Sequence, residues 1–143
     1  MEVKNKIPNT KIFEFHSEVK DACSVGVNQN NIHSITENKT VVITALPGAF
    51  TPTCSTKHLP DFIKNYSKII DANVNTVCFI SVNDPFVMHA WGELNNVPPT
   101  MRMLADSNAE FTREMGLSIN LEDIGLGLRS HRYTLVVKNS VIE

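Results

Sequence analysis

The sequence predicts a single α/β domain with a central mixed β-sheet and helices on both of its faces. The chain has 143 residues, which suits one domain with a substantial core. Continuously apolar, β-branched runs alternate along it with segments of helical periodicity, and the alternation ends in a hairpin pattern. Strands that are apolar on both sides are typical of a sheet covered by helices on both faces.

The first strand signals come early in the chain. Phe13 and Phe15 alternate with polar residues, which predicts a short edge strand. Residues Thr40 to Leu46, TVVITAL, are the first strong candidate for a strand buried on both faces. A second buried strand is expected over Thr76 to Val82.

Between these strands, the turn PGAFTPT should lead into a helix. Apolar residues recur there at spacings of three and four and give one apolar face. Pro60 falls within this pattern, so we expect a kink or a local break at that point. The residues of the apolar face are Leu59, Phe62, Ile63, Tyr66, Ile69 and Ile70.

The second half of the chain continues the alternation. Asn83-Asp84-Pro85 is a capping sequence before a helix over Phe86 to Leu94. Arg102 to Ala105 should form a short strand. Asp106 to Leu117 should form a helix that Gly116 closes.

The C-terminal pattern is that of a hairpin. Arg132 to Val137 and Val141-Ile142 flank an Asn-Ser turn. The second strand of this hairpin has barely begun at Glu143, and an unpaired strand is a liability. We therefore expect one domain over residues 1–143 that lacks its natural C-terminal end.

Charge and hydropathy exclude several kinds of partner. The formal net charge is -2 and no block of lysine or arginine occurs, so neither nucleic acid nor an anionic membrane is expected as a partner. No stretch approaches the roughly 18 apolar residues of a membrane span, and the N-terminus lacks a signal-peptide pattern. The expected location is cytoplasmic, and an organellar form whose targeting segment has been removed is also compatible with the sequence.

Cysteine use points to a reducing compartment. The three cysteines, Cys23, Cys54 and Cys78, are an odd number and contain no CxxC pair. That pattern argues against a secreted disulfide framework, a zinc ribbon and a dithiol redox pair.

Cys54 has the most unusual position of the three. With Thr51 as N-cap and Pro52 as the first helical residue, Cys54 is the third residue of a helix. Unpaired backbone N–H groups and the helix dipole stabilise a thiolate there, so the pKa of the thiol should fall below about 8.5. A permanent positive charge could come from Arg129 or Arg132, at the start of a strand that could lie beside the strand before Cys54.

Several segments resemble one family. Pro47, Thr51 and Cys54 form the pattern P-x-x-x-T-x-x-C, which resembles the active-site signature of peroxiredoxins. PGAFTPTCS with HLPDF, SVNDPFVMHAW and RSHRYTLVVKN resemble the type-5, atypical or glutaredoxin-linked, subfamily. The resemblance extends from about Val41 to Glu143.

The resemblance implies a thioredoxin-like fold and the reduction of hydrogen peroxide and organic hydroperoxides. It makes Cys54 the peroxidatic nucleophile that becomes a sulfenic acid. Thr51 would hold the sulfur and the peroxide through its hydroxyl, and Pro47 would shield the pocket from water. Arg132 would lower the thiol pKa and polarise the peroxide, and the main-chain N–H groups of Thr53 and Cys54 would contact the peroxide oxygens.

The resemblance also implies partners. We expect a one-cysteine cycle reduced by glutathione, or by glutaredoxin with glutathione, with thioredoxin as the second choice. Neither a metal nor another cofactor is implied, because the sulfur does the chemistry. A homodimer is expected. Some members of the subfamily resolve the sulfenic acid with a second cysteine near the C-terminus, a region that the sequence does not contain.

Structural interpretations stand beside these functional ones. Cys78 in VCFIS should be inert core, whereas Cys23 in a polar segment could be exposed. His58 and Cys54 could form half a zinc site, but no other ligands are evident, so we expect His58 to be a solvated or hydrogen-bonding helix histidine. Phe50 could be a pocket wall, a dimer contact or both, and Arg129 a supporting ion pair or nothing. Core positions are expected for Phe86, Met88 and Trp91, some of which could instead meet a second subunit.

Two other functions remain open at this point. A thioredoxin-like disulfide oxidoreductase would share the fold, but the absence of CxxC argues against it. A redox-sensing interaction protein or holdase would use Cys54 as a sensor and would change partner or oligomer size on oxidation.

Overall fold

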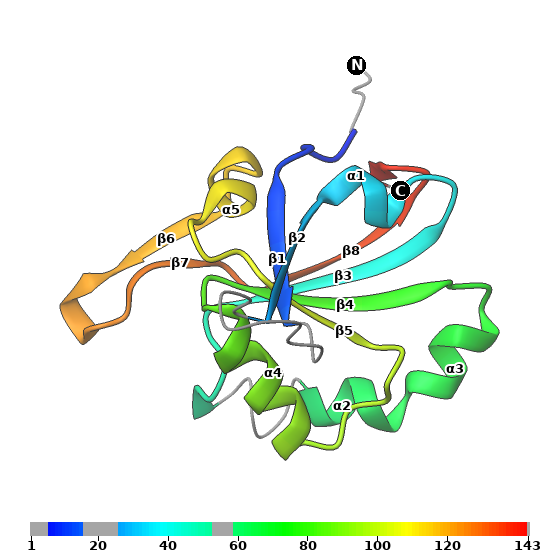
Figure 1. Cartoon of the computed structure of the whole chain (residues 1–143), viewed down its shortest axis with the longest axis horizontal. Helices are drawn as coiled ribbons and strands as arrows, with labels where there is room; N and C mark the ends of the chain where they lie inside the picture. Colours follow the sequence, from blue (N-terminus) through cyan, green and yellow to red (C-terminus); the bar gives the residue numbers. More distant parts are fainter. Residues whose placement is uncertain (1–5, 16–25, 53–58, 143) are drawn as a thin grey trace.

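A seven-stranded mixed β-sheet forms the centre of the molecule (Figure 1). The computed structural model describes residues 6–15, 26–52 and 59–142. The strand order is β2-β1-β5-β4-β3-β8-β9, and a separate two-stranded sheet is formed by β6 and β7. The strands are β1 Lys11–Phe15, β2 Val27–Asn31, β3 Thr40–Leu46, β4 Thr76–Ser81, β5 Arg102–Ala105, β6 Ser118–Leu121, β7 Gly127–Ser130, β8 Tyr133–Lys138 and β9 Val141–Ile142.

Helices cover both faces of the sheet, as the sequence predicts (Figure 1). The helices are α1 Ile32–Thr36, α2 Leu59–Lys64, α3 Tyr66–Asp71, α4 Pro85–Leu94 and α5 Glu110–Glu114, with a 3₁₀ turn, η2, over Glu122–Ile124. On one face, Leu59 of α2 and Trp91 of α4 are buried in a cluster with Phe79 of β4. On the other, Ile32 of α1 and Phe111 of α5 are buried in a cluster with Ile43 of β3. The sheet therefore has two apolar cores, one on each side.

The central strands determine where the candidate site lies. β3 and β4 are parallel, and β3 also pairs with β8 in antiparallel register, with Ala45 opposite Tyr133. All of β4 after Thr76 is buried, and so is β3 after Thr40. The loops that follow β3 and β4 therefore leave the sheet at the same edge, where β8 begins.

Some predictions for the N-terminal part are wrong. β1 is not an edge strand, because β2 pairs with it on one side and β5 on the other. The sequence VNQNN of β2 is polar, so it shows none of the apolar alternation that would have indicated a strand. β2 forms because the backbone of β1 offers it hydrogen bonds, and it is β2 that occupies the sheet edge.

The predicted break in the first long helix lies elsewhere. Pro60 belongs to α2, and the regular helix is interrupted instead at Asn65, between α2 and α3. The Asn65 side chain donates to the carbonyl of Asp61 at 2.9 Å, so its amide competes for helix hydrogen bonds at the break.

The predicted helix over Asp106 to Leu117 is much shorter than expected. α5 spans Glu110–Glu114, and Ala109 before it has a positive φ of 57°. The buried Asp106 carboxylate accepts hydrogen bonds from the N–H groups of Phe111 and Thr112 and from the Thr112 hydroxyl. Asp106 thus caps a helix that starts later, while Gly116 follows the helix with φ of 72°, as predicted.

The predicted start of α4 and the C-terminal turn agree with the structure, but one predicted core position does not. The Asp84 side chain caps α4 by accepting from the Val87 N–H at 2.9 Å, with Pro85 as the first helical residue. Asn139 and Ser140 form the turn between β8 and β9 with positive φ angles. Met88 and Trp91 are fully buried, whereas Phe86 is 48% exposed and is not part of the core.

Candidate active site

The predicted site lies at the turn that follows β3 and precedes α2 in the chain. Pro47, Gly48, Ala49, Phe50 and Thr51 form this turn, which follows directly from the buried end of β3. Thr53, Cys54 and His58 lie outside the described residues, as does Cys23. The structure therefore describes this part of the site as far as Pro52, two residues before Cys54 in the sequence.

Thr51 closes the turn on itself. Its hydroxyl donates to the carbonyl of Gly48 at 2.7 Å, and its N–H points at the same oxygen at 3.4 Å. A hydroxyl has one hydrogen and two acceptor lone pairs. Because the hydrogen is committed to Gly48, the Thr51 oxygen can only accept a hydrogen bond from a third group.

Phe50 takes a backbone conformation that is unfavourable for its side chain. Its φ is 65°, in the left-handed region that non-glycine residues rarely adopt, at a cost of about 1–2 kcal/mol. The ring is 49% exposed, so burial of the side chain does not compensate for this cost. Contacts from outside the turn must hold this conformation, and two side chains supply them.

Arg129, at the end of β7, is the first of these side chains. Its Nη1 donates to the carbonyl of Pro47 at 3.0 Å and its Nε donates to the carbonyl of Leu126 at 2.8 Å. A Cβ at Gly48 would lie only 2.5 Å from Nη1, so glycine allows this approach. The sequence left Arg129 as a supporting ion pair or nothing, but the structure makes it a clamp on the turn.

Asn83 is the second side chain, which the sequence pattern placed only in the capping sequence before α4. Its Oδ1 accepts the N–H of Ala49 at 3.0 Å and the hydroxyl of Ser81 at 2.6 Å. Its own carbonyl accepts from the Ser107 hydroxyl at 3.2 Å. The amide thus joins the loop after β3 to the loop after β4.

Arg132 lies at the same edge of the sheet. It is exposed and stands one residue before Tyr133, which pairs with Ala45, two residues before Pro47. The prediction that its strand lies beside the strand before Cys54 is confirmed by the pairing of β8 with β3. The structure therefore brings Pro47, Thr51, Arg129 and Arg132 to one edge.

Cys78 has no part in this arrangement. It is fully buried in β4, and burial raises the pKa of its thiol to about 12. The thiol is therefore neutral at physiological pH and inert as a nucleophile, as predicted. The described residues contain no group of three or more His, Cys, Asp or Glu side chains that could hold a metal ion.

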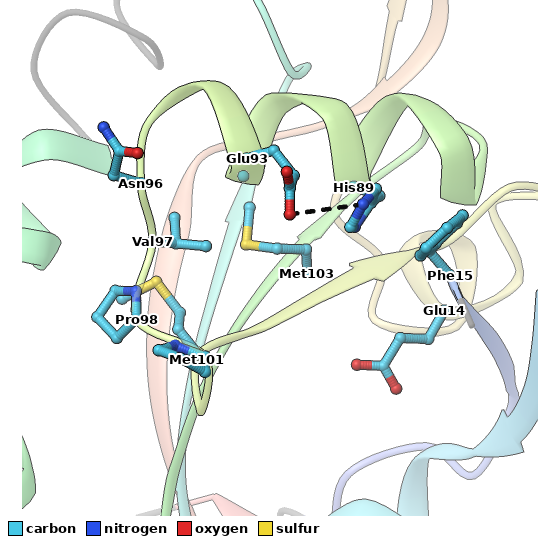
Figure 2. A pocket seen from close by; sticks show the side chains of 11 residues that line it. Glu14, Phe15, His89, Glu93, Asn96, Val97, Pro98, Met101 and Met103 are labelled. Carbon is cyan, nitrogen blue, oxygen red and sulfur yellow. Dashed lines mark ion pairs between the residues drawn. The ribbon is translucent and has the colours of Figure 1, made fainter. Parts of the chain in front are cut away.

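A cavity of about 410 Å³ lies apart from the turn, between α4, β1 and β5 (Figure 2). Phe15 stacks on His89 with ring centroids 3.8 Å apart. The His89 Nε2 lies 3.7 Å from the Glu93 Oε2. Arg102 forms a bidentate ion pair with Glu14, in which its Nε and Nη2 donate to the two carboxylate oxygens. Of the predicted site residues that the structure describes, none lines this cavity.

Comparison with known proteins agrees on one family. The redoxin family model matches residues 2–143. The chain is 39% identical over 148 residues to peroxiredoxin y4vD of Sinorhizobium fredii, covering 100% of this chain and 77% of the relative. It is 45% identical over 107 residues to the hybrid peroxiredoxin hyPrx5 of Haemophilus influenzae, covering 75% of this chain and 44% of the relative.

Solved structures give the same result. Reduced Prx3 of Vibrio vulnificus in complex with hydrogen peroxide is 36% identical with a TM-score of 0.88, covering 99% of this chain and 85% of that one. The 1-Cys peroxiredoxin of Plasmodium falciparum is 28% identical with a TM-score of 0.87, covering 99% and 81%. Within the described part of the chain, no helix has the length and apolar character needed to cross a membrane.

Proposed function

Because this chain belongs to the peroxiredoxins and is a thiol-dependent peroxidase, we propose that it reduces hydrogen peroxide and organic hydroperoxides through Cys54 at the turn after β3. The observation that carries the assignment is the closed turn of Pro47 to Thr51, which places an accepting hydroxyl oxygen three residues before Cys54. The relative from Vibrio vulnificus was crystallised with hydrogen peroxide, which supports the substrate class.

In the proposed reaction, the Cys54 thiolate attacks the nearer hydroperoxide oxygen, the one that carries hydrogen. An S–O bond forms, the O–O bond breaks, and its electron pair leaves with the other oxygen, which takes a proton to become water or an alcohol. The sulfur is oxidised to sulfenic acid and the peroxide is reduced. The N–H groups of Thr53 and Cys54 and the Arg132 guanidinium would stabilise the developing charge.

Thr51 would orient the peroxide in this scheme. Its oxygen can accept the O–H of the peroxide because its own hydrogen is donated to Gly48. This direction of the hydrogen bond leaves the attacked oxygen facing donors and the sulfur rather than the threonine proton. Pro47, which is half-buried and has no N–H, would exclude water beside it.

Replacing the Thr51 hydroxyl should separate this role from packing. We expect Thr51→Val to slow oxidation of Cys54 by about 10²-fold, the usual effect of losing one oriented polar group. Thr51→Ser, which keeps the hydroxyl, should stay close to the wild-type rate. Rapid mixing with hydrogen peroxide measures both, and Thr134→Val, which removes a hydroxyl from β8, is the control. Equal rates for Thr51→Val and the wild type would rule out the proposed role.

The reductant belongs to the same proposal. A one-cysteine cycle needs an external thiol: glutathione condenses with the sulfenic acid to a mixed disulfide and water, and a second thiol releases the Cys54 thiolate. Cys78 is buried and inert, so it is not a partner for the sulfenic acid. Glutathione or glutaredoxin with glutathione is our first choice, thioredoxin the second, and a reducing compartment such as the cytoplasm supplies each of them. This chemistry requires neither a metal nor another cofactor.

A homodimer would cover the apolar surface beside the turn. Phe50, on the turn after β3, is 49% exposed, and Phe86, at the start of α4, is 48% exposed. We expect Phe86→Gln to raise the dimer dissociation constant by about 10-fold, because burying half of a phenylalanine ring stabilises by roughly 1–1.5 kcal/mol. Sedimentation across a dilution series measures this constant. Leu94→Gln, 71% exposed at the other end of α4, is the matched control and should leave it unchanged.

A further inference from the structure

The turn after β3 is held from outside by a side chain that belongs to another strand's loop. Asn83 follows β4 and reaches across to the N–H of Ala49 at 3.0 Å. Ala49 lies between Gly48 and Phe50. The Gly48 carbonyl accepts from the hydroxyl and the N–H of Thr51, and the φ of Phe50 is 65°. The bond from Asn83 therefore acts on the central peptide of the turn.

The orientation of the Asn83 amide is itself fixed. The Ser81 hydroxyl donates to the same Oδ1 at 2.6 Å, and Ser81 is fully buried. The Ala49 N–H can only donate, so the amide oxygen and not the NH₂ group faces it, and the Ser81 hydroxyl adds a second hydrogen bond to that oxygen. The Ser107 hydroxyl donates to the Asn83 carbonyl and holds the backbone of the same residue.

We propose that Asn83 is a positioning residue for the peroxide reaction. It holds the Gly48–Thr51 turn in the conformation in which the Thr51 oxygen can accept a hydrogen bond from the peroxide. The inference rests on the proposed function, in which that turn serves Cys54. Without the Asn83 oxygen, the Ala49 N–H loses its protein acceptor and the left-handed Phe50 loses one of its two external supports. The turn then samples other conformations, and the reacting groups are misaligned for part of the time.

The test compares Asn83→Ala and Asn83→Asp with the wild type. The rate of Cys54 oxidation by hydrogen peroxide is measured for each variant on the plateau of its pH–rate profile, where added charge does not change thiol ionisation. Asn83→Ala should be slower by on the order of 10- to 100-fold. Asn83→Asp keeps the accepting oxygen and should recover most of this loss.

Asn75→Ala is the matched control. The Asn75 Oδ1 accepts the N–H of Thr40 at 2.8 Å, so this variant removes the same kind of bond at the start of β3, away from the turn. It should lower the melting temperature about as much as Asn83→Ala while leaving the oxidation rate unchanged. A rate loss in Asn75→Ala equal to that in Asn83→Ala would mean that general destabilisation explains both, and it would overturn the proposal.

Other outcomes are equally decisive. A wild-type rate for Asn83→Ala, or an Asn83→Asp variant as slow as Asn83→Ala, overturns the inference. If Asn83→Ala does not fold, Ser81→Ala is tested in its place. This variant removes one of the two hydrogen bonds to the Asn83 side-chain oxygen, so it should slow the reaction by about 5-fold, the effect expected for one hydrogen bond. An unchanged rate in Ser81→Ala overturns the inference. If the wild type does not consume peroxide through Cys54, the proposed function fails instead.

Discussion

Cys54→Ser is expected to abolish peroxide reduction, with a loss of more than about 10³-fold in the rate of peroxide consumption. A serine hydroxyl is not ionised at neutral pH and is a poor nucleophile toward the O–O bond, whereas a cysteine thiolate is a good one. With one equivalent of hydrogen peroxide and no other thiol, the wild type should gain one oxygen atom on the peptide that contains Cys54. With glutathione added, it should consume peroxide continuously.

The other two cysteines provide the controls for this experiment. Cys23→Ser and Cys78→Ala should retain the oxidation of Cys54 and the turnover with glutathione. Cys78→Ala will lower stability by about 1 kcal/mol because it leaves a small cavity in β4, but it removes a thiol that is neutral at physiological pH. Turnover by Cys54→Ser at the wild-type rate would contradict the assigned nucleophile. Turnover that disappears in Cys23→Ser would contradict the one-cysteine cycle.

The central part of the fold was predictable because its signals are local. TVVITAL and TVCFIS are apolar throughout, and a strand covered on both faces has that composition. Asp84 and Pro85 stand at the positions that begin a helix, and the Asn139-Ser140 turn has residues that tolerate positive φ. In each of these cases the residues that decide the structure are neighbours in the chain.

The parts that were missed depend on residues distant in the chain. The polar strand β2 exists because β1 pairs with it, and nothing in VNQNN indicates that partner. The start of α5 is displaced because Asp106 accepts from Phe111 and Thr112 across a left-handed Ala109, a spacing that no local capping rule anticipates. The β6–β7 hairpin, whose strands flank η2, was likewise not predicted.

In the candidate site too, some residues were predictable from local sequence and others were not. Pro47 and Thr51 could be chosen from a short motif, and the edge that gathers them with Arg132 was predictable from the strand order. Asn83 could not be chosen, because its bond to Ala49 spans 34 positions and leaves no pattern in the sequence. The strand pattern offered both Arg129 and Arg132, and only the resemblance to peroxiredoxins assigned the role to Arg132.

Arg132→Gln is expected to slow Cys54 oxidation by about 10²- to 10³-fold and to move the pH–rate profile to higher pH. Arg129 donates to the carbonyls of Pro47 and Leu126. Arg132, exposed directly before β8, is the arginine that we propose acts on the sulfur and the peroxide, as the resemblance to peroxiredoxins implies. Its charge favours the thiolate, so removing it should raise the pKa of the Cys54 thiol toward the ordinary value of about 8.5.

A lysine at this position separates charge from geometry. Arg132→Lys keeps the positive charge, so its pH–rate profile should stay near that of the wild type, but it loses the planar donor fork and should be about 10-fold slower on the plateau. Arg113→Gln is the matched control, because it removes an exposed arginine of α5, away from the turn, whose side chain donates to the carbonyl of Asn108 at 2.8 Å. An unchanged thiol titration in Arg132→Gln would contradict the electrostatic role. A large loss in Arg129→Gln with no loss in Arg132→Gln would reverse the roles of the two arginines and make the clamp on Pro47 the more important contact.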